Sequence, residues 1–137
     1  MRVTEVSMEI AASAARLVVE EGLDYGAAKR KAARDLGRRS GRDSGDLPSH
    51  EAVEDEVRDY LALFCADTQP AELRALRELA LVWMVRVAEF QPHLSGAAWR
   101  GTATRLSPVW IDLYCDDPKA PEIAFLNAGV QVDSQGG

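Results

Sequence analysis

Apolar residues recur at steps of three and four near the start of the chain. Val6, Ile10, Ala14 and Leu17 would form one stripe on a helix, which predicts an amphipathic helix over this stretch. Gly22 follows the stripe in the position where a glycine commonly ends a helix. The pattern therefore predicts that the first helix packs one face against other helices and ends at Gly22.

A second helix is expected to follow after a short turn. Asp24 is suited to cap it, and Gly37 is suited to end it, so we expect it to span residues 25–36. Small side chains form most of its apolar face, at Ala28, Ala32, Ala33 and Leu36. A face of alanines allows close approach to a partner helix.

A third helix is predicted to begin after Ser49, with Glu51 in its first turn, and to end near Asp67. Its apolar stripe consists of Val53, Val57, Tyr60, Leu61 and Phe64.

A fourth helix is predicted to begin at Pro70 and to end before Pro92. Its inward residues are expected to be Leu73, Leu76, Leu79, Ala80, Trp83, Val87 and Phe90. Only Arg86 is charged between Leu79 and Ala88, so this helix is apolar nearly all round. That pattern is typical of a central helix covered on several sides.

After Gly96 the apolar period changes from 3.6 to 2. This change predicts strands over 97–104 and 109–115, a short helix over 122–127 and a further short strand over 130–132. The core face of the second strand should carry Val109, Ile111, Leu113 and Cys115. We therefore expect an α+β fold, in which four N-terminal helices precede a small β-sheet of two or three strands with a short C-terminal helix.

The length of 137 residues suits one domain, which we expect to span residues 1–132. Its helical part should cover about 5–92 and its sheet part about 97–132, followed by a disordered tail at 133–137. No apolar run is long enough for a membrane span, and no secretory signal is visible, so a cytoplasmic location is expected. Cys65 and Cys115 are interpreted as buried thiols.

The strongest charge asymmetry lies between Lys29 and Arg42. This segment holds seven basic residues and one acid, which gives it a charge of +6 in a chain of net charge −6. An anion-binding arm for phosphate or nucleic acid is one interpretation, with candidate residues Lys29, Arg30, Arg34, Arg38, Arg39 and Arg42. The alternative is a solvated face that pairs with acids elsewhere. Residues 38–48 are rich in Gly and Ser and are expected to form a mobile basic loop.

The segment from Ala97 to Val132 offers the most specific candidate chemistry. Gly101 and Thr102 end one predicted strand, Ser107 follows, and Asp112 lies on the next strand. This arrangement resembles the core of the nucleotidyltransferase fold, in which a small-residue pair approaches a triphosphate and two strand carboxylates hold magnesium. The resemblance implies nucleotide binding at Gly101, Thr102 and Ser107, with Asp112 as the catalytic candidate.

One departure from that family pattern decides what activity to expect. Trp110 stands where the first metal-binding carboxylate would lie, and an indole cannot ligate magnesium. A single acid makes a poor two-metal site. The resemblance therefore implies a degenerate, non-catalytic protein with no metal site and no cofactor, and Mg²⁺ would matter only if activity remained.

Two further resemblances concern longer stretches. Residues 22–33, 60–64 and 115–119 resemble a small family of uncharacterised bacterial proteins that are nucleotidyltransferase-like; some members carry the name of UDP-N-acetylmuramate–alanine ligases. Residues 6–37 resemble the start of a tetracycline-repressor-type helix-turn-helix, although no recognition helix follows Gly37. Three functions thus stay open: nucleotide or nucleic-acid binding, helix-turn-helix-like DNA binding, and a helical protein-interaction module that binds a protein partner.

Overall fold

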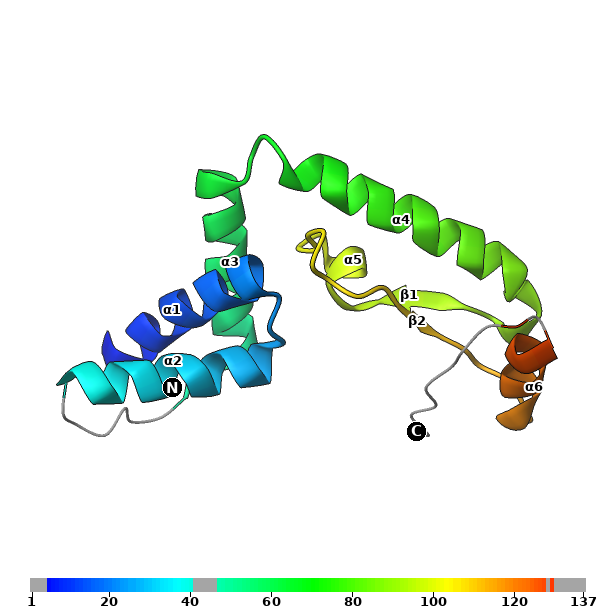
Figure 1. The fold of residues 1–137 in the computed structure, drawn as a ribbon, viewed down its shortest axis with the longest axis horizontal. Coiled ribbons are helices and arrows are strands. Elements are labelled where there is room, and N and C mark those ends of the chain that lie inside the picture. The colour runs from blue at the N-terminus through cyan, green and yellow to red at the C-terminus, as the bar shows by residue number, and fades with distance from the viewer. Residues whose placement is uncertain (1–4, 41–46, 128, 130–137) are drawn as a thin grey trace.

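The computed structural model describes residues 5–40, 47–127 and 129 (Figure 1). Four helices come first: α1 (Glu5–Glu21), α2 (Tyr25–Ser40), α3 (His50–Phe64) and α4 (Gln69–Arg86). A 3₁₀ turn (Ala88–Phe90), strand β1 (His93–Ser95), helix α5 (Gly96–Arg100), strand β2 (Trp110–Asp112) and helix α6 (Lys119–Asn127) follow. This order confirms the expected α+β class, with four N-terminal helices, a two-stranded antiparallel sheet and a short C-terminal helix.

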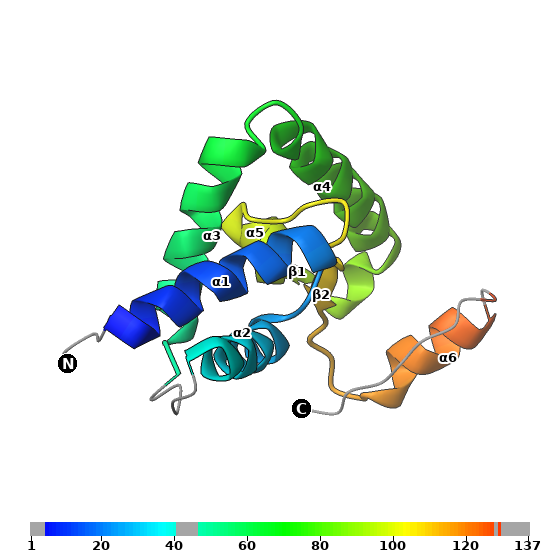
Figure 2. The ribbon, with the colours of Figure 1, turned by 60° about the vertical axis from the view of Figure 1, so that its left-hand side comes forward.

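The main hydrophobic core lies among the first three helices. Ile10 of α1 and Val53 and Val57 of α3 are completely buried there. The predicted alanine face of α2 is also confirmed, because Ala28, Ala32 and Ala33 belong to this core. Figures 1 and 2 show α1 lying beside both α2 and α3.

Local sequence signals set most of the helix ends. Gly22 adopts a φ of +73° and its N–H bonds the carbonyl of Val18 at 3.1 Å, as expected for the end of α1. A carboxylate oxygen of Asp24 accepts a hydrogen bond from the Ala27 amide at 2.7 Å, and Ser49 Oγ accepts one from Ala52 at 3.0 Å. Two expected ends were wrong: α2 runs past Gly37 to Ser40, and α3 stops at Phe64 rather than near Asp67.

Helix α4 corrects the expectation of a central, covered helix. Of its own residues only Gln69 and Ala80 are buried, and Leu79, expected to face inward, is 49% exposed. Phe64, the last stripe residue of α3, is likewise exposed rather than buried. Figure 1 shows why: α4 lies along the outside of the molecule, with α5 and the strands on one side of it.

The expected strand over 97–104 was also wrong. Its first half forms α5, and the strand that pairs with β2 lies earlier, at β1. The register places His93 opposite Asp112 and Ser95 opposite Trp110. Gly96, with a φ of +71°, turns the chain out of β1 into α5 in a conformation that a side chain would strain. The expected strand at 130–132 and tail at 133–137 lie outside the described residues.

The last helix begins earlier than predicted, at Lys119, where a carboxylate oxygen of Asp117 accepts a hydrogen bond from the Lys119 amide at 3.0 Å. It lies near the end of α4, with the ring of Phe125 6.4 Å from that of Trp83. Cys115 is exposed and Cys65 half-buried, so neither is the buried thiol that we expected. Among the described residues, no helix combines the length and apolar character that a membrane crossing requires.

Candidate functional site

The residues of the predicted nucleotide site line neither of the two pockets that the structure describes. Gly101 ends α5 with a φ of +91°, and Thr102 is buried directly after it. Ser107 Oγ accepts a hydrogen bond from the Thr104 amide at 2.9 Å and so stabilises a turn. Asp112 is exposed on β2, as is Trp110 two positions before it. Across residues 5–40 and 47–127, no group of three or more His, Cys, Asp or Glu side chains is placed to hold a metal ion.

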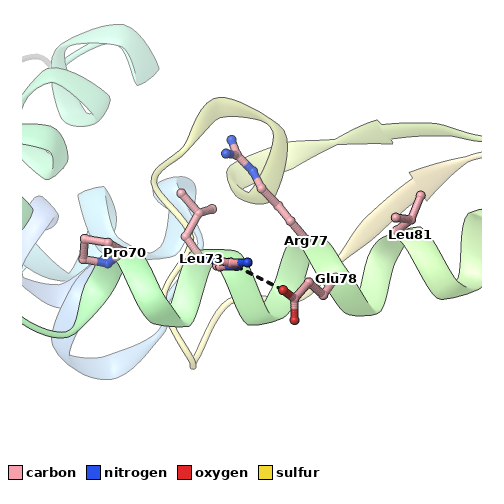
Figure 3. A pocket seen from close by; sticks show the side chains of 6 residues that line it. Pro70, Leu73, Arg77, Glu78 and Leu81 are labelled. Carbon is pink, nitrogen blue, oxygen red and sulfur yellow. Dashed lines mark hydrogen bonds and ion pairs between the residues drawn. The ribbon is translucent and has the colours of Figure 1, made fainter.

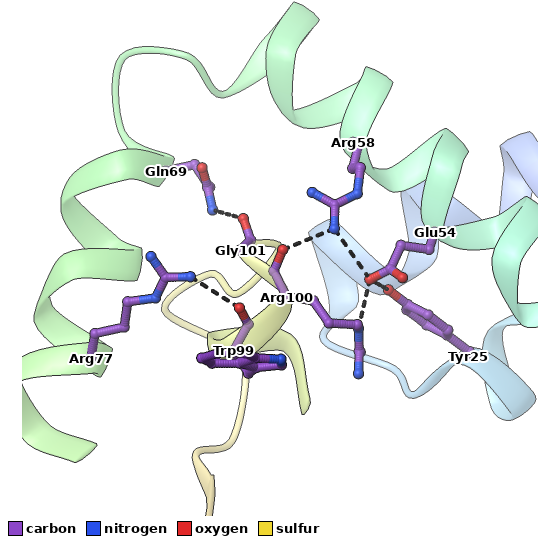
Figure 4. Close-up of polar contacts among 8 residues, drawn as sticks. All are labelled: Tyr25, Glu54, Arg58, Gln69, Arg77, Trp99, Arg100 and Gly101. Atoms are coloured by element: carbon purple, nitrogen blue, oxygen red, sulfur yellow. Dashed lines mark hydrogen bonds and ion pairs between the residues drawn. The ribbon is translucent and has the colours of Figure 1, made fainter. Parts of the chain in front are cut away.

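Gly101 instead belongs to a dense set of hydrogen bonds at the C-terminal end of α5 (Figure 4). Arg77 of α4 donates to the carbonyls of Ala98 at 2.7 Å and Trp99 at 3.2 Å. Arg58 of α3 donates to the carbonyl of Arg100 at 2.8 Å. The helix-end carbonyls that lack a partner within α5 thus receive side-chain donors from two other helices. We call this set, with Gln69, the α5 cap.

Gln69 extends the α5 cap into the following loop. Its side-chain amide donates to the carbonyls of Gly101 at 3.3 Å and Ala103 at 2.8 Å. Glu72 holds the same loop further along, since its carboxylate accepts from the Arg105 amide at 2.8 Å. Both side chains come from the first turn of α4, so the start of α4 fixes residues 101–105.

A second polar group joins α5 to the three-helix core. Glu54 of α3 accepts hydrogen bonds from Arg100 Nε at 2.6 Å and from the Tyr25 hydroxyl at 3.3 Å. The guanidinium of Arg100 also lies 5.7 Å from the centre of the Tyr25 ring. Burial favours the neutral form of Arg100, but its bonds to Glu54 and Tyr25 hold its pKa above the ordinary value.

For Tyr25, in contrast, burial raises the pKa, and the Glu54 carboxylate adds to the rise. A hydrogen bond with Thr102 would lower the pKa of Tyr25. The two hydroxyls do not have hydrogen-bond geometry, and Thr102 Oγ1 is buried without a partner among the described residues.

The electrostatics of the α5 cap favour cations. The end of a helix that presents its carbonyls carries the negative end of the helix dipole, which attracts guanidinium groups and repels phosphate. Arg58 and Arg77 already occupy that end, and both donate to protein carbonyls. The cap therefore acts as a joint between helices, and its geometry gives no support to triphosphate binding at Gly101 and Thr102.

The structure separates the predicted anion-binding residues into two groups. Lys29 is engaged, because its Nζ donates to the carbonyl of Pro48 at 2.9 Å. Arg30 and Arg34 are exposed one turn apart on α2 and form no ion pair with a described residue. Arg38 and Arg39 extend α2, but the structure does not describe their side chains, and Arg42 lies outside the described residues.

Large apolar side chains are exposed on the outer side of α4. Four large apolar side chains of this helix are 49–69% exposed: Leu79, Leu81, Val82 and Val85. We call these four residues the α4 surface. Figure 3 shows a shallow hollow beside it, along α4, lined by Pro70, Leu73, Arg74, Arg77, Glu78 and Leu81.

Sequence reasoning missed both arrangements for different reasons. The α5 cap joins residues 21–42 positions apart, and no local pattern marks Arg58 or Arg77 as donors to a helix end. The α4 surface did leave a signal, the uninterrupted apolar run from Leu79 to Val85. That signal was interpreted as burial within this chain, whereas the structure leaves much of the run uncovered.

Comparisons with known proteins add no functional assignment. The chain matches no protein-family model, and no curated protein or solved structure is significantly similar to it.

Proposed function

We propose that the chain is a protein-interaction module that binds another polypeptide through the α4 surface. The observation that carries the proposal is the exposure of Leu79, Leu81, Val82 and Val85 on a single helix. Contiguous apolar patches are uncommon on monomeric soluble proteins and mark interaction sites. A helix whose apolar residues point outward is suited to packing against a second helix or an apolar groove.

The rest of α4 explains why the α4 surface is free to bind. The inner side of the helix is held in place by three residues. Gln69 and Arg77 belong to the α5 cap, and Ala80 is buried. A rigidly held helix loses little conformational freedom when a partner covers its outer side. Complete burial of such a side chain stabilises by about 1.5–3 kcal/mol, so covering the exposed half of each would contribute roughly 1 kcal/mol per residue.

Site-specific photo-crosslinking in the cells that make the protein tests this proposal. A photoreactive phenylalanine analogue replaces Val82, and the matched control places it at Met8 of α1, which is 56% exposed against 51% for Val82. We expect a covalent adduct with a second polypeptide at position 82 and none at position 8. Equal yields at the two positions, or no adduct at either, would overturn the proposal.

The basic side of α2 supports a second candidate function, binding to the phosphate backbone of nucleic acid. Its specific support is the pair Arg30 and Arg34, which are exposed and lack a described acidic partner. Affinity for a random-sequence DNA duplex should then fall steeply with salt, because each neutralised phosphate releases counterion. Glutamine at both positions should weaken binding for all sequences alike, whereas Arg74→Gln on α4 should not. Absence of binding at low salt would contradict this candidate.

A further inference from the structure

On the outer side of α4, residues at equal distances in sequence before and after Val82 correspond in chemical character. Leu79 lies three positions before it and Val85 three positions after it. Glu78 lies four positions before it and Arg86 four positions after it. Apolar residues thus match apolar residues across this centre, while an acid matches a base.

All five residues lie on one side of the helix. At about 100° per residue, they fall within an arc of roughly 120° centred on Val82. All five are exposed, while the buried Ala80 lies on the opposite side. We call these five residues the α4 seam; Leu81, although exposed, projects about 100° away from Val82 and lies outside it.

We propose that the partner of the α4 surface is a second copy of this chain, whose α4 packs antiparallel against the first about a two-fold axis at Val82. This inference rests on the proposed function and names its partner. In such a pair Val82 meets its own copy, Leu79 meets Val85, and Glu78 meets Arg86. An isologous interface of this kind is the commonest symmetric association of soluble proteins.

Charge complementarity selects this arrangement among the ways of pairing two α4 helices. Within one chain Glu78 and Arg86 lie about 12 Å apart along the helix axis, too far for an ion pair. A parallel pair would place glutamate beside glutamate and arginine beside arginine, which is unfavourable. Only the antiparallel pair brings each Glu78 to an Arg86 of the other copy.

The existing contacts of the two charged residues permit this pairing. Glu78 forms an exposed ion pair with Arg74 at 3.1 Å, and Arg86 lies 5.0 Å from the centre of the Trp83 ring. The carboxylate of Glu78 has a second oxygen, and a guanidinium carries five N–H donors. Each side chain therefore retains groups for a partner across the seam.

Sedimentation velocity measures the association directly. The full chain should sediment as a dimer, at twice the monomer mass of 15.0 kDa, when concentrated, and dissociate on dilution. Val82→Asp should reduce the association constant by at least about tenfold, because it places two like charges together on the axis. Met8→Asp on α1, a similarly exposed position outside the α4 surface, should leave the constant unchanged. A concentrated wild-type chain that stays monomeric would overturn the inference.

Charge exchange tests the register. Glu78→Arg and Arg86→Glu should each weaken the dimer, since each places like charges opposite one another. The chain with both substitutions should regain the wild-type association constant, because the exchanged pair is again complementary. No restoration in the double variant would show that the antiparallel register is wrong.

A symmetric crosslink tests the axis. In a chain with Cys65→Ser and Cys115→Ser, Val82→Cys should form a disulfide-linked dimer under mild oxidation, because two-fold related residues at a helix contact lie within disulfide reach. The matched variant Leu81→Cys, which is similarly exposed, should not. Equal crosslinking by the two variants would contradict the proposed axis.

The photo-crosslinking experiment separates failure of this inference from failure of the proposed function. An adduct at position 82 with the mass of two chains supports both. An adduct of another mass overturns the second copy as partner and leaves the protein-interaction module standing. No adduct at position 82 overturns both proposals.

Discussion

Apolar side chains on α3 differ sharply in how far they are buried. Val53 is fully buried in the three-helix core, whereas Leu63 is 76% exposed. We expect Val53→Ala to lower the free energy of unfolding by about 2 kcal/mol, because it leaves a cavity among packed neighbours. Leu63→Ala should change it by less than about 0.5 kcal/mol. Urea denaturation monitored by far-UV circular dichroism measures both, and equal losses would show that Val53 does not belong to the core.

Residue-scale signals account for much of what the sequence could predict. Asp24 and Ser49 cap their helices through bonds to amides three positions ahead, so their roles follow from local composition. Burial of Ile10 and Val53 follows from helical spacing. Exposure of Leu79 does not, because periodicity shows that a helix is apolar without showing whether its own chain covers it.

At the scale of elements, the short helix α5 depends on side chains from its neighbours. Arg77→Met removes the donors to Ala98 and Trp99 while keeping an unbranched, flexible side chain. We expect amide hydrogen exchange at Gly101 and Thr102, which bond the carbonyl of Ala97, to accelerate about tenfold, since leaving carbonyls unpaired costs on the order of 1–3 kcal/mol.

Arg74→Met is the matched control for that measurement, because among the described residues Arg74 bonds an exposed glutamate one turn away and no part of α5. It should leave exchange at Gly101 and Thr102 unchanged. If Arg77→Met leaves exchange unchanged as well, the α5 cap is not what holds the helix.

The same dependence explains why α5 was expected to be a strand. The strand expected over 97–104 needs a period of two, which only residues 102–104 follow. A five-residue segment is also too short to form a helix on its own. The donors that stabilise it come from Arg58, Gln69 and Arg77, far earlier in the chain. Tertiary contacts therefore override the local pattern, and the predicted nucleotide site at Gly101 and Thr102 becomes a helix end.

At the scale of the whole molecule, Tyr25, Glu54 and Arg100 join the three-helix core to α5. We expect the contribution of this joint to the free energy of unfolding to fall at alkaline pH. Burial raises the pKa of Tyr25 above 10.0, so the unfolded chain releases this proton at a lower pH than the folded chain. The stabilisation from Tyr25 is fully present below pH 10.0 and is lost as the pH rises through the raised pKa.

Urea denaturation of the wild type and of Tyr25→Phe tests this expectation. The midpoint urea concentration of each chain is measured near pH 8 and near pH 11. The wild type should lose more stability over that interval than the variant, which has no phenol to ionise. Lysine and arginine titrations are common to both chains and cancel in the comparison. Equal losses would mean that Tyr25 titrates alike in the folded and unfolded states.

The α5 cap also imposes an order on folding. The residues of the three-helix core all lie within the first 65 residues, so that core can condense once α3 has left the ribosome. Helix α4 must wait, because the carbonyls that Gln69 and Arg77 bind belong to residues 98–103. Until the ribosome has released that segment, both sides of α4 are uncovered. A released chain truncated before Gly96 would therefore display the apolar run of α4 on its inner side as well, and would be a better substrate for chaperones than the finished protein.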